Sequence, residues 1–197
     1  AELNHFVEEL KKTADELTES RESFRHAAYH QLLTGLPNRS YVIELIDQLL
    51  SNGGGQAASR FAVLLLNLDR FRTINESLGY QTGDRVIRYV ASKLSEMARA
   101  GEIVGHFGGD QFTVILPGIA DEAAATAFAD KIGTTLGEAI RFKGRQVYTS
   151  ASIGVVFNGT AHKKAEDILR DADIAMYNAK DNNKSWLVFD KTMHSRA

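Results

Sequence analysis

The sequence predicts a mixed α/β (α+β) domain with a β-α-β-β-α-β core, preceded by a helix and followed by one more strand. Three observations lead to this class. An unbroken apolar run from Phe61 to Leu66 is typical of a central strand that is covered on both faces. Two short apolar segments flank Gly108-Gly109-Asp110, a sequence typical of a β-hairpin turn. Segments with apolar residues at helical spacing separate these strands.

The composition is that of an ordinary globular domain. The chain has 197 residues, of which 24% are charged and 44% hydrophobic, so it forms one or at most two domains. It contains no cysteine, which excludes a disulfide framework, a thiolate nucleophile and a Cys-based metal site. A net charge of -2 argues against an extended nucleic-acid interface, so no nucleic-acid partner is expected.

The longest apolar run is far shorter than the roughly 18 residues that a membrane span needs, so no span is expected in this segment. The opening residues do not have the pattern of a secretory signal, and the first residue is Ala rather than Met. The sequence is therefore interpreted as a segment of a longer protein. We expect this segment to lie in the cytoplasm, whether or not the parent protein is attached to a membrane.

Residues 1–28 differ from the rest of the chain because they lack Gly and Pro and are rich in charged residues. Apolar residues recur there at alternating steps of four and three, the spacing of a heptad repeat, which Arg21 interrupts. The residues of this seam are Leu3, Val7, Leu10, Ala14, Leu17, Phe24 and Ala28. The narrow stripe favours a homodimeric coiled coil, and a helix packed on its own domain is the alternative.

The remaining elements follow between residues 29 and 190. The expected elements are a helix over 39–50, a strand over 60–68, a helix over 84–98, two strands over 103–107 and 111–116, a helix over 121–140, a strand pair within 146–157, a helix over 165–179 and a strand over 185–189. Their order is the ferredoxin-like arrangement. Because that arrangement hosts many activities, the function must be argued from a site.

Two unusual polar sequences fall where this fold brings strand ends together. Asn67 closes the most buried strand, and Asp110 lies in the hairpin turn. Because the strand and the hairpin are neighbours, Asp110 can face Asn67 and supply an oxygen ligand for magnesium bound with a phosphate chain. Each feature alone has a simpler interpretation. Gly-Gly-Asp is usually a tight turn, and Lys180 and Lys184, one helical turn apart, are usually part of a solvated face. Their joint occurrence in this order favours a site.

The sequence resembles the GGDEF domain of diguanylate cyclases over residues 29–190. The motifs that carry the resemblance are Leu33-Thr34-Gly35-Leu36-Pro37-Asn38-Arg39, Leu68-Asp69-Arg70-Phe71 with Ile74-Asn75, Gly83-Asp84, Gly108-Gly109-Asp110-Gln111-Phe112 and the run from Ala172 to Lys180. The residues from Phe189 to His194 are similar to the segment that leads into a following EAL phosphodiesterase domain. The resemblance implies a signalling helix over 1–28, a GGDEF domain over 29–190 and the start of a linker over 191–197.

The resemblance implies an activity and a guanine site. Members of this family condense two GTP molecules into cyclic di-GMP within an antiparallel dimer, by metal-assisted attack of a ribose 3'-hydroxyl on an α-phosphate. Matched by position, Asn75 and Asp84 read the guanine edge, and Phe71 is a further nucleotide-binding residue. GTP or cyclic di-GMP is the implied ligand, and Mg2+ or Mn2+ the implied cofactor.

The resemblance also implies a phosphate site. Gly108 and Gly109 let the backbone approach the phosphates, because residues without a Cβ allow it. Arg72, Lys180 and Lys184 bind phosphate charge. At Arg72 and Lys184 the family more often has Lys and Arg respectively, so the charge persists while its hydrogen-bond geometry changes.

Two departures from the family pattern affect the metal. The family's first metal-binding aspartate is Asn67 here, and the glutamate at the fourth place of GGDEF, a catalytic position, is Gln111. The implied metal ligands that remain are the Asp110 carboxylate, also a catalytic position, and the main-chain carbonyl of Leu68, with Asp69 beside them. One carboxylate is compatible with a single magnesium ion held with GTP, but it supports a two-metal arrangement poorly.

Two further departures affect regulation. The family has an Asp and an Arg, understood as a regulatory charge pair, where this sequence has Gln31 and His106. The inhibitory product site of the family, an RxxD motif, corresponds to Arg99 and Glu102. The same two residues are also typical of an ordinary surface pair.

Three functions are compatible with these residues. The favoured one is a degenerate GGDEF domain that binds GTP with magnesium and regulates a neighbouring domain, for which an EAL domain in the same parent chain is expected. The alternatives are an active or weakly active diguanylate cyclase and a dimerisation scaffold with an empty pocket. The retained guanine and phosphate residues argue against the scaffold, and the two amides argue against full activity.

Overall fold

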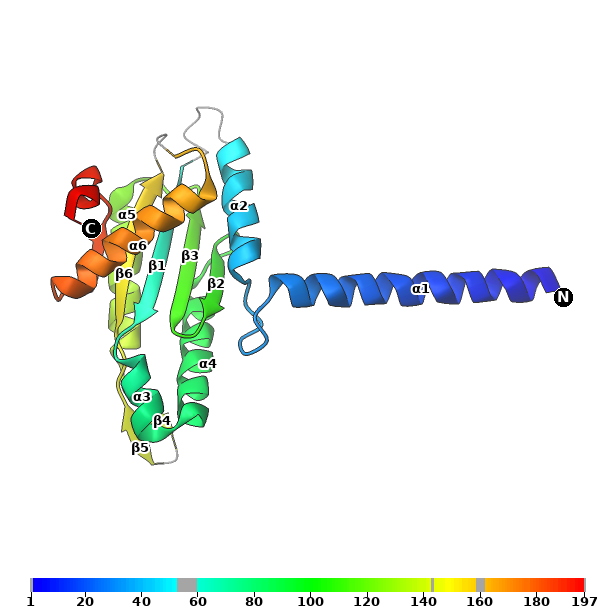
Figure 1. Cartoon of the computed structure of the whole chain (residues 1–197), viewed down its shortest axis with the longest axis horizontal. Coiled ribbons are helices and arrows are strands. Elements are labelled where there is room, and N and C mark those ends of the chain that lie inside the picture. Colours follow the sequence, from blue (N-terminus) through cyan, green and yellow to red (C-terminus); the bar gives the residue numbers. More distant parts are fainter. Residues whose placement is uncertain (1, 53–59, 143, 159–161, 197) are drawn as a thin grey trace.

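A five-stranded sheet forms the centre of the protein (Figure 1). The computed structural model describes residues 2–52, 60–142, 144–158 and 162–196. The strands are β1 (Phe61–Leu68), β2 (Ile103–Gly108), β3 (Gln111–Pro117), β4 (Ile140–Phe142), β5 (Arg145–Val147), β6 (Ala151–Asn158) and β7 (Trp186–Val188). The order in the large sheet is β2-β3-β1-β6-β7, with β7 parallel to β6 and the other pairs antiparallel. The order β6-β1-β3-β2 is that of a ferredoxin-like sheet, so the predicted fold class is confirmed.

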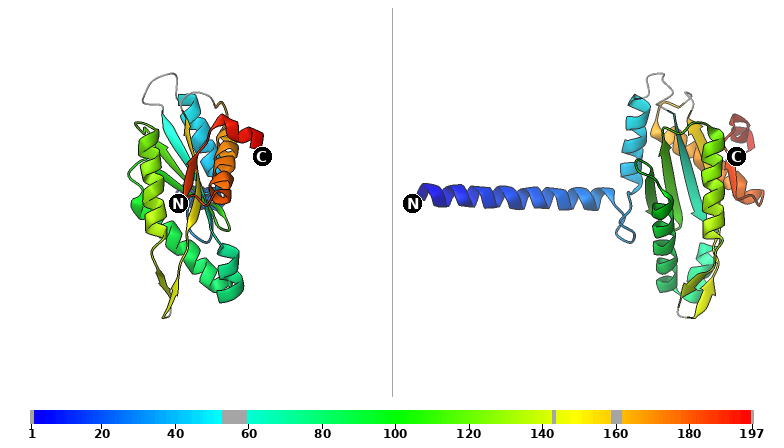
Figure 2. Two further views of the ribbon diagram at one scale, coloured as in Figure 1. Left: turned by 90° about the vertical axis from the view of Figure 1, so that its left-hand side faces the viewer. Right: turned by 180° about the vertical axis from the view of Figure 1, so that it is seen from behind.

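Helices cover both faces of this sheet (Figure 2). They are α2 (Arg39–Asn52), α3 (Phe71–Leu78), α4 (Tyr80–Met97), α5 (Glu122–Leu136) and α6 (Ala165–Asp181). α2 and α6 pack on one face through residues such as Ile46 and Leu169, whereas α4 and α5 pack on the other through Leu94 and Ile132. β1 supplies alternate residues to both cores, which explains its continuous apolar run.

The N-terminal helix α1 (Glu2–Tyr29) extends away from the sheet (Figure 1). It confirms the predicted N-terminal helix. Its apolar residues are largely exposed, with Leu10 at 54%, Leu17 at 61% and Phe24 at 75%. The seam residues whose side chains are described are therefore exposed to solvent along most of the helix. This surface is available to a partner. No helix in the described part of the chain is long and apolar enough to cross a membrane.

The structure corrects the sequence-based predictions around two groups of short elements, α3 with the start of α4, and the β4–β5 hairpin. α3 was not predicted, and α4 begins at Tyr80 rather than Asp84, because Gly79 at φ 84° separates the two helices. The helix predicted over 121–140 ends at Leu136, and Ile140 instead begins β4. The predicted strand pair within 146–157 is wrong, since β5 pairs with β4 in a separate hairpin while β6 pairs with β1.

Candidate functional site

The end of β1 and the β2–β3 hairpin lie together, as the sequence predicted. Asn67 is directly opposite Gln111 in the β1–β3 register, and the amide of Leu68 donates to the carbonyl of Asp110 at 3.0 Å. Directly opposite residues place their side chains on the same face of a sheet. The two residues that depart from the family's carboxylates are therefore cross-strand neighbours, which the sequence alone did not reveal.

A lysine from α6 reaches this pair. Phe61 and Leu65 lie on the same face of β1 as Asn67, because side chains an even number of residues apart share a face. Both pack in the core shared with α2 and α6, so Asn67 faces those helices. The ammonium of Lys180, in the last turn of α6, donates to Asn67 Oδ1 at 3.1 Å. The predicted phosphate-binding Lys180 is thus placed at the strand end, beside the hairpin.

Asp69, which follows β1, is held by hydroxyl groups. Ser150 donates to one carboxylate oxygen at 2.6 Å, and Ser152 donates to the other at 2.8 Å. The backbone amide of Asp69 also donates to the Ser150 carbonyl at 2.8 Å. Because both oxygens already accept hydrogen bonds, this carboxylate fastens the end of β1 to the start of β6.

The hairpin turn is supported by a buried histidine. His106, only 2% exposed, lies with Nε2 3.0 Å from the Gly109 carbonyl oxygen and Nδ1 3.1 Å from the Thr34 hydroxyl. Gly109 itself has φ 56°, a conformation that glycine adopts at little cost. Gln31 also approaches the turn, since its side-chain nitrogen lies 3.6 Å from the position of a Cβ on Gly108. At the positions of the family's charge pair, His106 therefore hydrogen-bonds to Thr34 and Gly109, and Gln31 lies near the turn.

Burial holds the pKa of His106 below its ordinary value of 6.5, although the bond to Gly109 opposes this shift. The unfolded chain therefore binds more protons than the folded chain once the pH falls below about 6.5. We expect the free energy of unfolding to decrease on acidification by up to about 1.4 kcal/mol per pH unit from this group. Denaturant-unfolding curves at pH 7.5, 6.5 and 5.5 measure this decrease in the free energy of unfolding. The His106→Gln variant, which keeps hydrogen-bonding atoms but does not titrate, is the control. Equal pH dependence in both proteins would contradict this expectation.

The two predicted guanine residues come from the α3–α4 pair. Asn75 lies on α3 with its side-chain oxygen against Gly83, where an added Cβ would overlap it and would also lie 3.2 Å from the Phe71 ring. Asp84 follows Gly83 in the first turns of α4 and is exposed. Gly83 therefore allows α3 and α4 to approach closely, which brings Asn75 next to the backbone that carries Asp84.

Two predicted phosphate-binding cations are placed differently from Lys180. Arg72 is 90% exposed and forms an ion pair with Glu76 at 2.7 Å, one turn further along α3. Lys184 lies beyond the end of α6, after Asn183 at φ 53°, and its amide donates to the Ala179 carbonyl. The interpretation of Lys180 and Lys184 as residues one helical turn apart is therefore wrong for Lys184.

The predicted product-site residues form a tight turn after α4. The amide of Arg99 donates to the Glu102 carboxylate at 2.7 Å, and the amide of Glu102 donates back to the Arg99 carbonyl at 2.9 Å. Both residues also line a surface hollow of about 510 Å³ between α2, α4 and β2. The Glu102 side chain thus has a structural role, while the hollow beside it leaves space for a ligand.

The donor set fits one metal ion that arrives with a nucleotide. Within the residues that the structure describes, no group of three or more His, Cys, Asp or Glu side chains is arranged to hold a metal. Asp110 is a carboxylate near the strand end, and Asn67 Oδ1 already accepts from Lys180. Magnesium often uses only one or two carboxylates and takes further ligands from phosphates and water. The residues present are compatible with that mode.

Comparison with solved structures defines the class of protein. The fold matches a truncated form of TpbB (YfiN) from Pseudomonas aeruginosa that comprises only the GGDEF domain, with a TM-score of 0.80 and 31% identity over 85% of this chain and 98% of that one. It also matches the coiled coil and GGDEF domain of DgcB from Caulobacter crescentus, in complex with c-di-GMP, with a TM-score of 0.84. That match covers 96% of this chain and 99% of the solved DgcB chain at 24% identity, so it supports the fold alone.

A family model described as "Diguanylate cyclase, GGDEF domain" matches residues 28–185. The chain belongs to this family of cyclic di-GMP signalling domains. It is 33% identical to the diguanylate cyclase TpbB of Pseudomonas aeruginosa over 91% of its length, and 31% identical to the cyclic di-GMP phosphodiesterase PdeR of Escherichia coli over 92%. The chain spans only 41% of TpbB and 27% of PdeR.

Proposed function

We propose that this domain binds GTP with one magnesium ion, makes little or no cyclic di-GMP, and uses nucleotide occupancy to regulate a neighbouring domain. The observation that carries the proposal is the Asn67–Gln111 pair. Both carboxylates that the family places there are amides, and the two amides are direct neighbours across β1 and β3. The β2–β3 hairpin is present beside β1, while the negative charge that would attract a second metal is absent from these two positions.

The remaining residues support nucleotide binding. Asp110 and the Leu68 carbonyl would hold the metal, which would neutralise phosphate charge when bound. Lys180 is placed at the same strand end, where its ammonium can exchange the Asn67 oxygen for a phosphate oxygen. Asn75 and Asp84 would read guanine from the α3–α4 pair, with Phe71 packed behind them. Arg72 would bind phosphate only after leaving Glu76, a surface pairing of small energy.

An active or weakly active diguanylate cyclase is the second candidate. It is favoured by the 33% identity to TpbB, which is a diguanylate cyclase. The two proposals make opposite statements about turnover, but they share the nucleotide site. In either case cyclic di-GMP could bind at the hollow beside Arg99 and Glu102.

We expect Lys180→Ala to weaken binding of GTP about tenfold while leaving guanosine unchanged, since an ammonium contributes to phosphate affinity through a charge-assisted hydrogen bond. Titration calorimetry with each ligand in Mg2+ measures both affinities. Lys131→Ala, which removes an exposed lysine on α5, is the matched control. If GTP and guanosine weaken equally, Lys180 has a structural role and the phosphate assignment is wrong.

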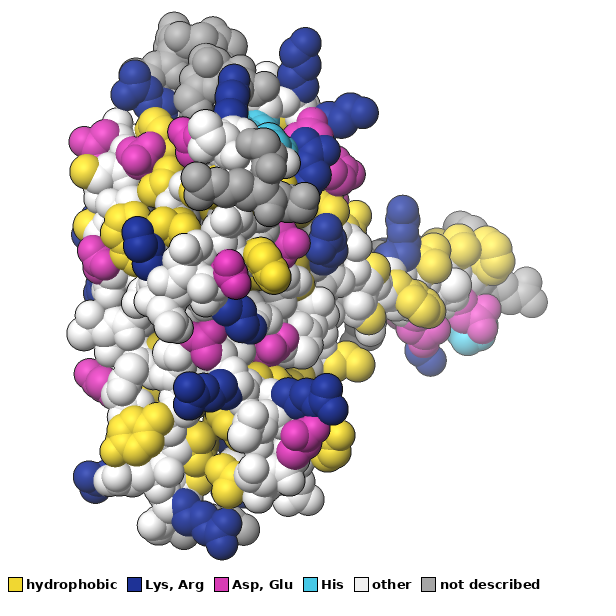
Figure 3. All heavy atoms as spheres, turned by 60° about the vertical axis from the view of Figure 1, so that its left-hand side comes forward, with side chains coloured by type: hydrophobic (Ala, Val, Ile, Leu, Met, Phe, Trp, Pro, Cys, Tyr) yellow, Lys and Arg dark blue, Asp and Glu magenta, His cyan; other side chains and the backbone are white. Residues whose placement is uncertain are grey.

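We also propose that α1 forms a homodimeric coiled coil. Hydrophobic side chains are visible along the projecting helix in Figure 3, and DgcB, whose structure includes a coiled coil, matches 96% of this chain. Two copies would bury the exposed seam of each other.

Replacing Leu10 and Leu17 with Asp would put charges into that seam without touching the sheet or its two cores. We expect light scattering to report a monomer for this variant and a dimer for the parent. The circular dichroism spectrum of the variant should remain that of a folded protein. A parent protein that is monomeric at high micromolar concentration would contradict the dimer.

The cellular location and the neighbouring domain are proposed as the sequence interpretation gave them. We propose that the domain works in the cytoplasm, next to an EAL phosphodiesterase domain of the same parent chain. The 31% identity to PdeR, a cyclic di-GMP phosphodiesterase, supports that pairing.

A further inference from the structure

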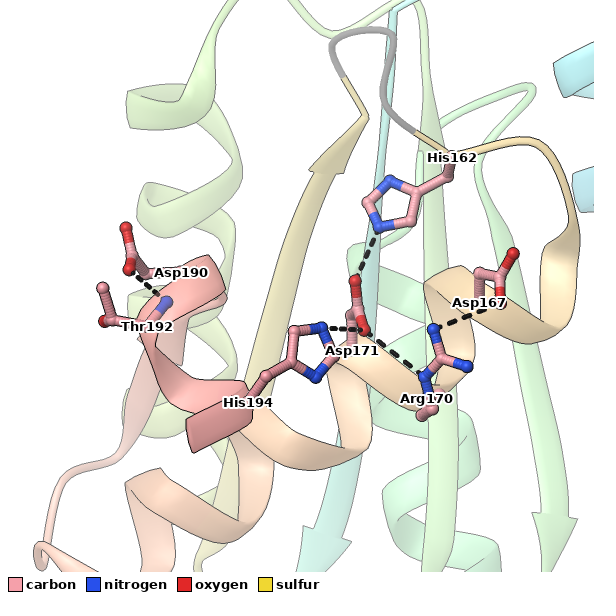
Figure 4. Close-up of polar contacts among 7 residues, drawn as sticks. All are labelled: His162, Asp167, Arg170, Asp171, Asp190, Thr192 and His194. Carbon is pink, nitrogen blue, oxygen red and sulfur yellow. Dashed lines mark hydrogen bonds and ion pairs between the residues drawn. The ribbon is translucent and has the colours of Figure 1, made fainter. Parts of the chain in front are cut away.

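A buried carboxylate on α6 takes no part in the nucleotide site. Asp171 is only 4% exposed, although it lies on a helix that otherwise buries small and apolar residues. An isolated carboxylate is costly to remove from water, so its partners must compensate its charge. Three basic side chains from three segments approach it, as Figure 4 shows: His162 before α6, Arg170 on α6, and His194 in the 3-10 helix η2 (Lys191–Arg196).

The three partners differ in how they hold Asp171. His162 Nε2 lies 2.7 Å from Oδ2, and both side chains are mostly buried. His194 Nε2 lies 3.3 Å from Oδ1 and is 44% exposed, while Arg170 lies 3.7 Å from Oδ1 and has a closer partner in Asp167 at 3.2 Å. Within the described residues, Oδ1 accepts no hydrogen bond. Oδ2 is therefore satisfied by His162, whereas Oδ1, although buried, has only the longer contacts to His194 and Arg170.

The residues around His194 form a small folded unit. The amide of Phe189 donates to the Val155 carbonyl at 2.8 Å, which continues the pairing of β7 with β6. Asp190 directly precedes η2, and its carboxylate accepts a hydrogen bond from the Thr192 amide at 2.8 Å. Hydrogen bonds from Thr192 hold the pKa of Asp190 below its ordinary value. The His194 ring returns edge-on to Phe189 with 5.1 Å between centroids. This unit presents His194 to α6 (Figure 4).

We propose that Asp171 and His194 form a latch that fastens residues 189–196 to α6. The latch would set the position of any polypeptide joined after residue 196. The same helix carries Lys180 in its last turn, so one helix holds both the nucleotide-site lysine and the latch. Release of His194 exposes an already half-exposed ring and leaves the His162–Asp171 pair in place, so the segment can detach while the domain stays folded.

The chain has no cysteine, so a single Lys191→Cys substitution allows one nitroxide label on an exposed position of η2. We expect an immobilised spectrum for this protein, and His194→Ala should raise the mobile fraction about threefold, the scale of a partly exposed ion pair. His194→Lys, which keeps a basic side chain that can pair with Asp171, should stay immobilised. Asp173→Asn, which removes an exposed carboxylate from the same helix, is the control and should also stay immobilised.

A double-mutant cycle shows whether the contact is direct. Once Asp171→Asn is present, His194→Ala should add little mobility, because the two residues act as one pair. The melting temperature of each variant reports whether the domain remains folded, and the His194 variants carry the test alone if Asp171→Asn unfolds the protein. An unchanged spectrum in His194→Ala, or additive effects in the cycle, would overturn the latch.

Discussion

Restoring both carboxylates in the Asn67→Asp/Gln111→Glu variant should raise cyclic di-GMP formation by a hundredfold or more, which corresponds to about 3 kcal/mol of activation free energy. The two positions are directly opposite across β1 and β3, so the substitutions place two negative charges side by side at nearly unchanged side-chain volume. Such a pair attracts divalent metal. Chromatography of the products formed from GTP and Mg2+ measures the gain.

The single variants and the metal dependence serve as controls. Neither Asn67→Asp nor Gln111→Glu alone should suffice, because groups that act as a unit are not additive. The double variant should melt at a lower temperature than the parent without Mg2+ and regain stability when Mg2+ is added, since opposed carboxylates repel. If it binds metal but makes no product, the replacement of the family's charge pair by Gln31 and His106 is the cause that limits activity, through a dimer that does not align the two substrates. High activity in either single variant would contradict the account.

The second large effect is expected at Asp84. Asp84→Ala should weaken GTP binding at least tenfold and remove its preference over ATP, because a hydrogen bond to a charged group contributes about 1.5–3 kcal/mol. The loss affects selectivity because the guanine donors would be left unpaired. Calorimetric titration of both nucleotides in Mg2+ measures the ratio of the two affinities.

Glu122→Ala provides the control, since it removes an exposed carboxylate from the first turn of α5 on the same fold. Its affinity for GTP should equal that of the parent. If Asp84→Ala binds GTP as tightly as the parent does, the guanine assignment is wrong. Circular dichroism of the variant confirms that α4 persists, as expected for an exposed position.

The parts of the fold that the sequence predicted are those with strong local patterns. The apolar run of β1, the Gly108–Asp110 turn and the long helix α1 all appear as expected. α3 was missed because it spans only eight residues between Arg70, with φ 55°, and Gly79. The β4–β5 hairpin was missed because each of its strands has three residues, too few to show an alternation.

The site was predicted in its main residues but not in its internal contacts. The nearness of Asp110 to the end of β1 followed from the expected strand order. The contact of His106 with Thr34 joins residues 72 positions apart, and its link to Gly109 depends on a register shift in β2 that no residue pattern marks. The Arg72–Glu76 pair has the i, i+4 spacing of a helix, so a prediction of α3 would have revealed it.

The central claim is binding of GTP without turnover, and one measurement on the unmodified protein tests it most directly. The protein is titrated with GTP in the presence of Mg2+ by calorimetry, and the same sample is then incubated and analysed for cyclic di-GMP by chromatography. The account predicts saturable binding at one site per chain, no displacement by ATP, and little or no cyclic di-GMP. Robust synthesis of cyclic di-GMP, or no heat of binding for GTP, would contradict it.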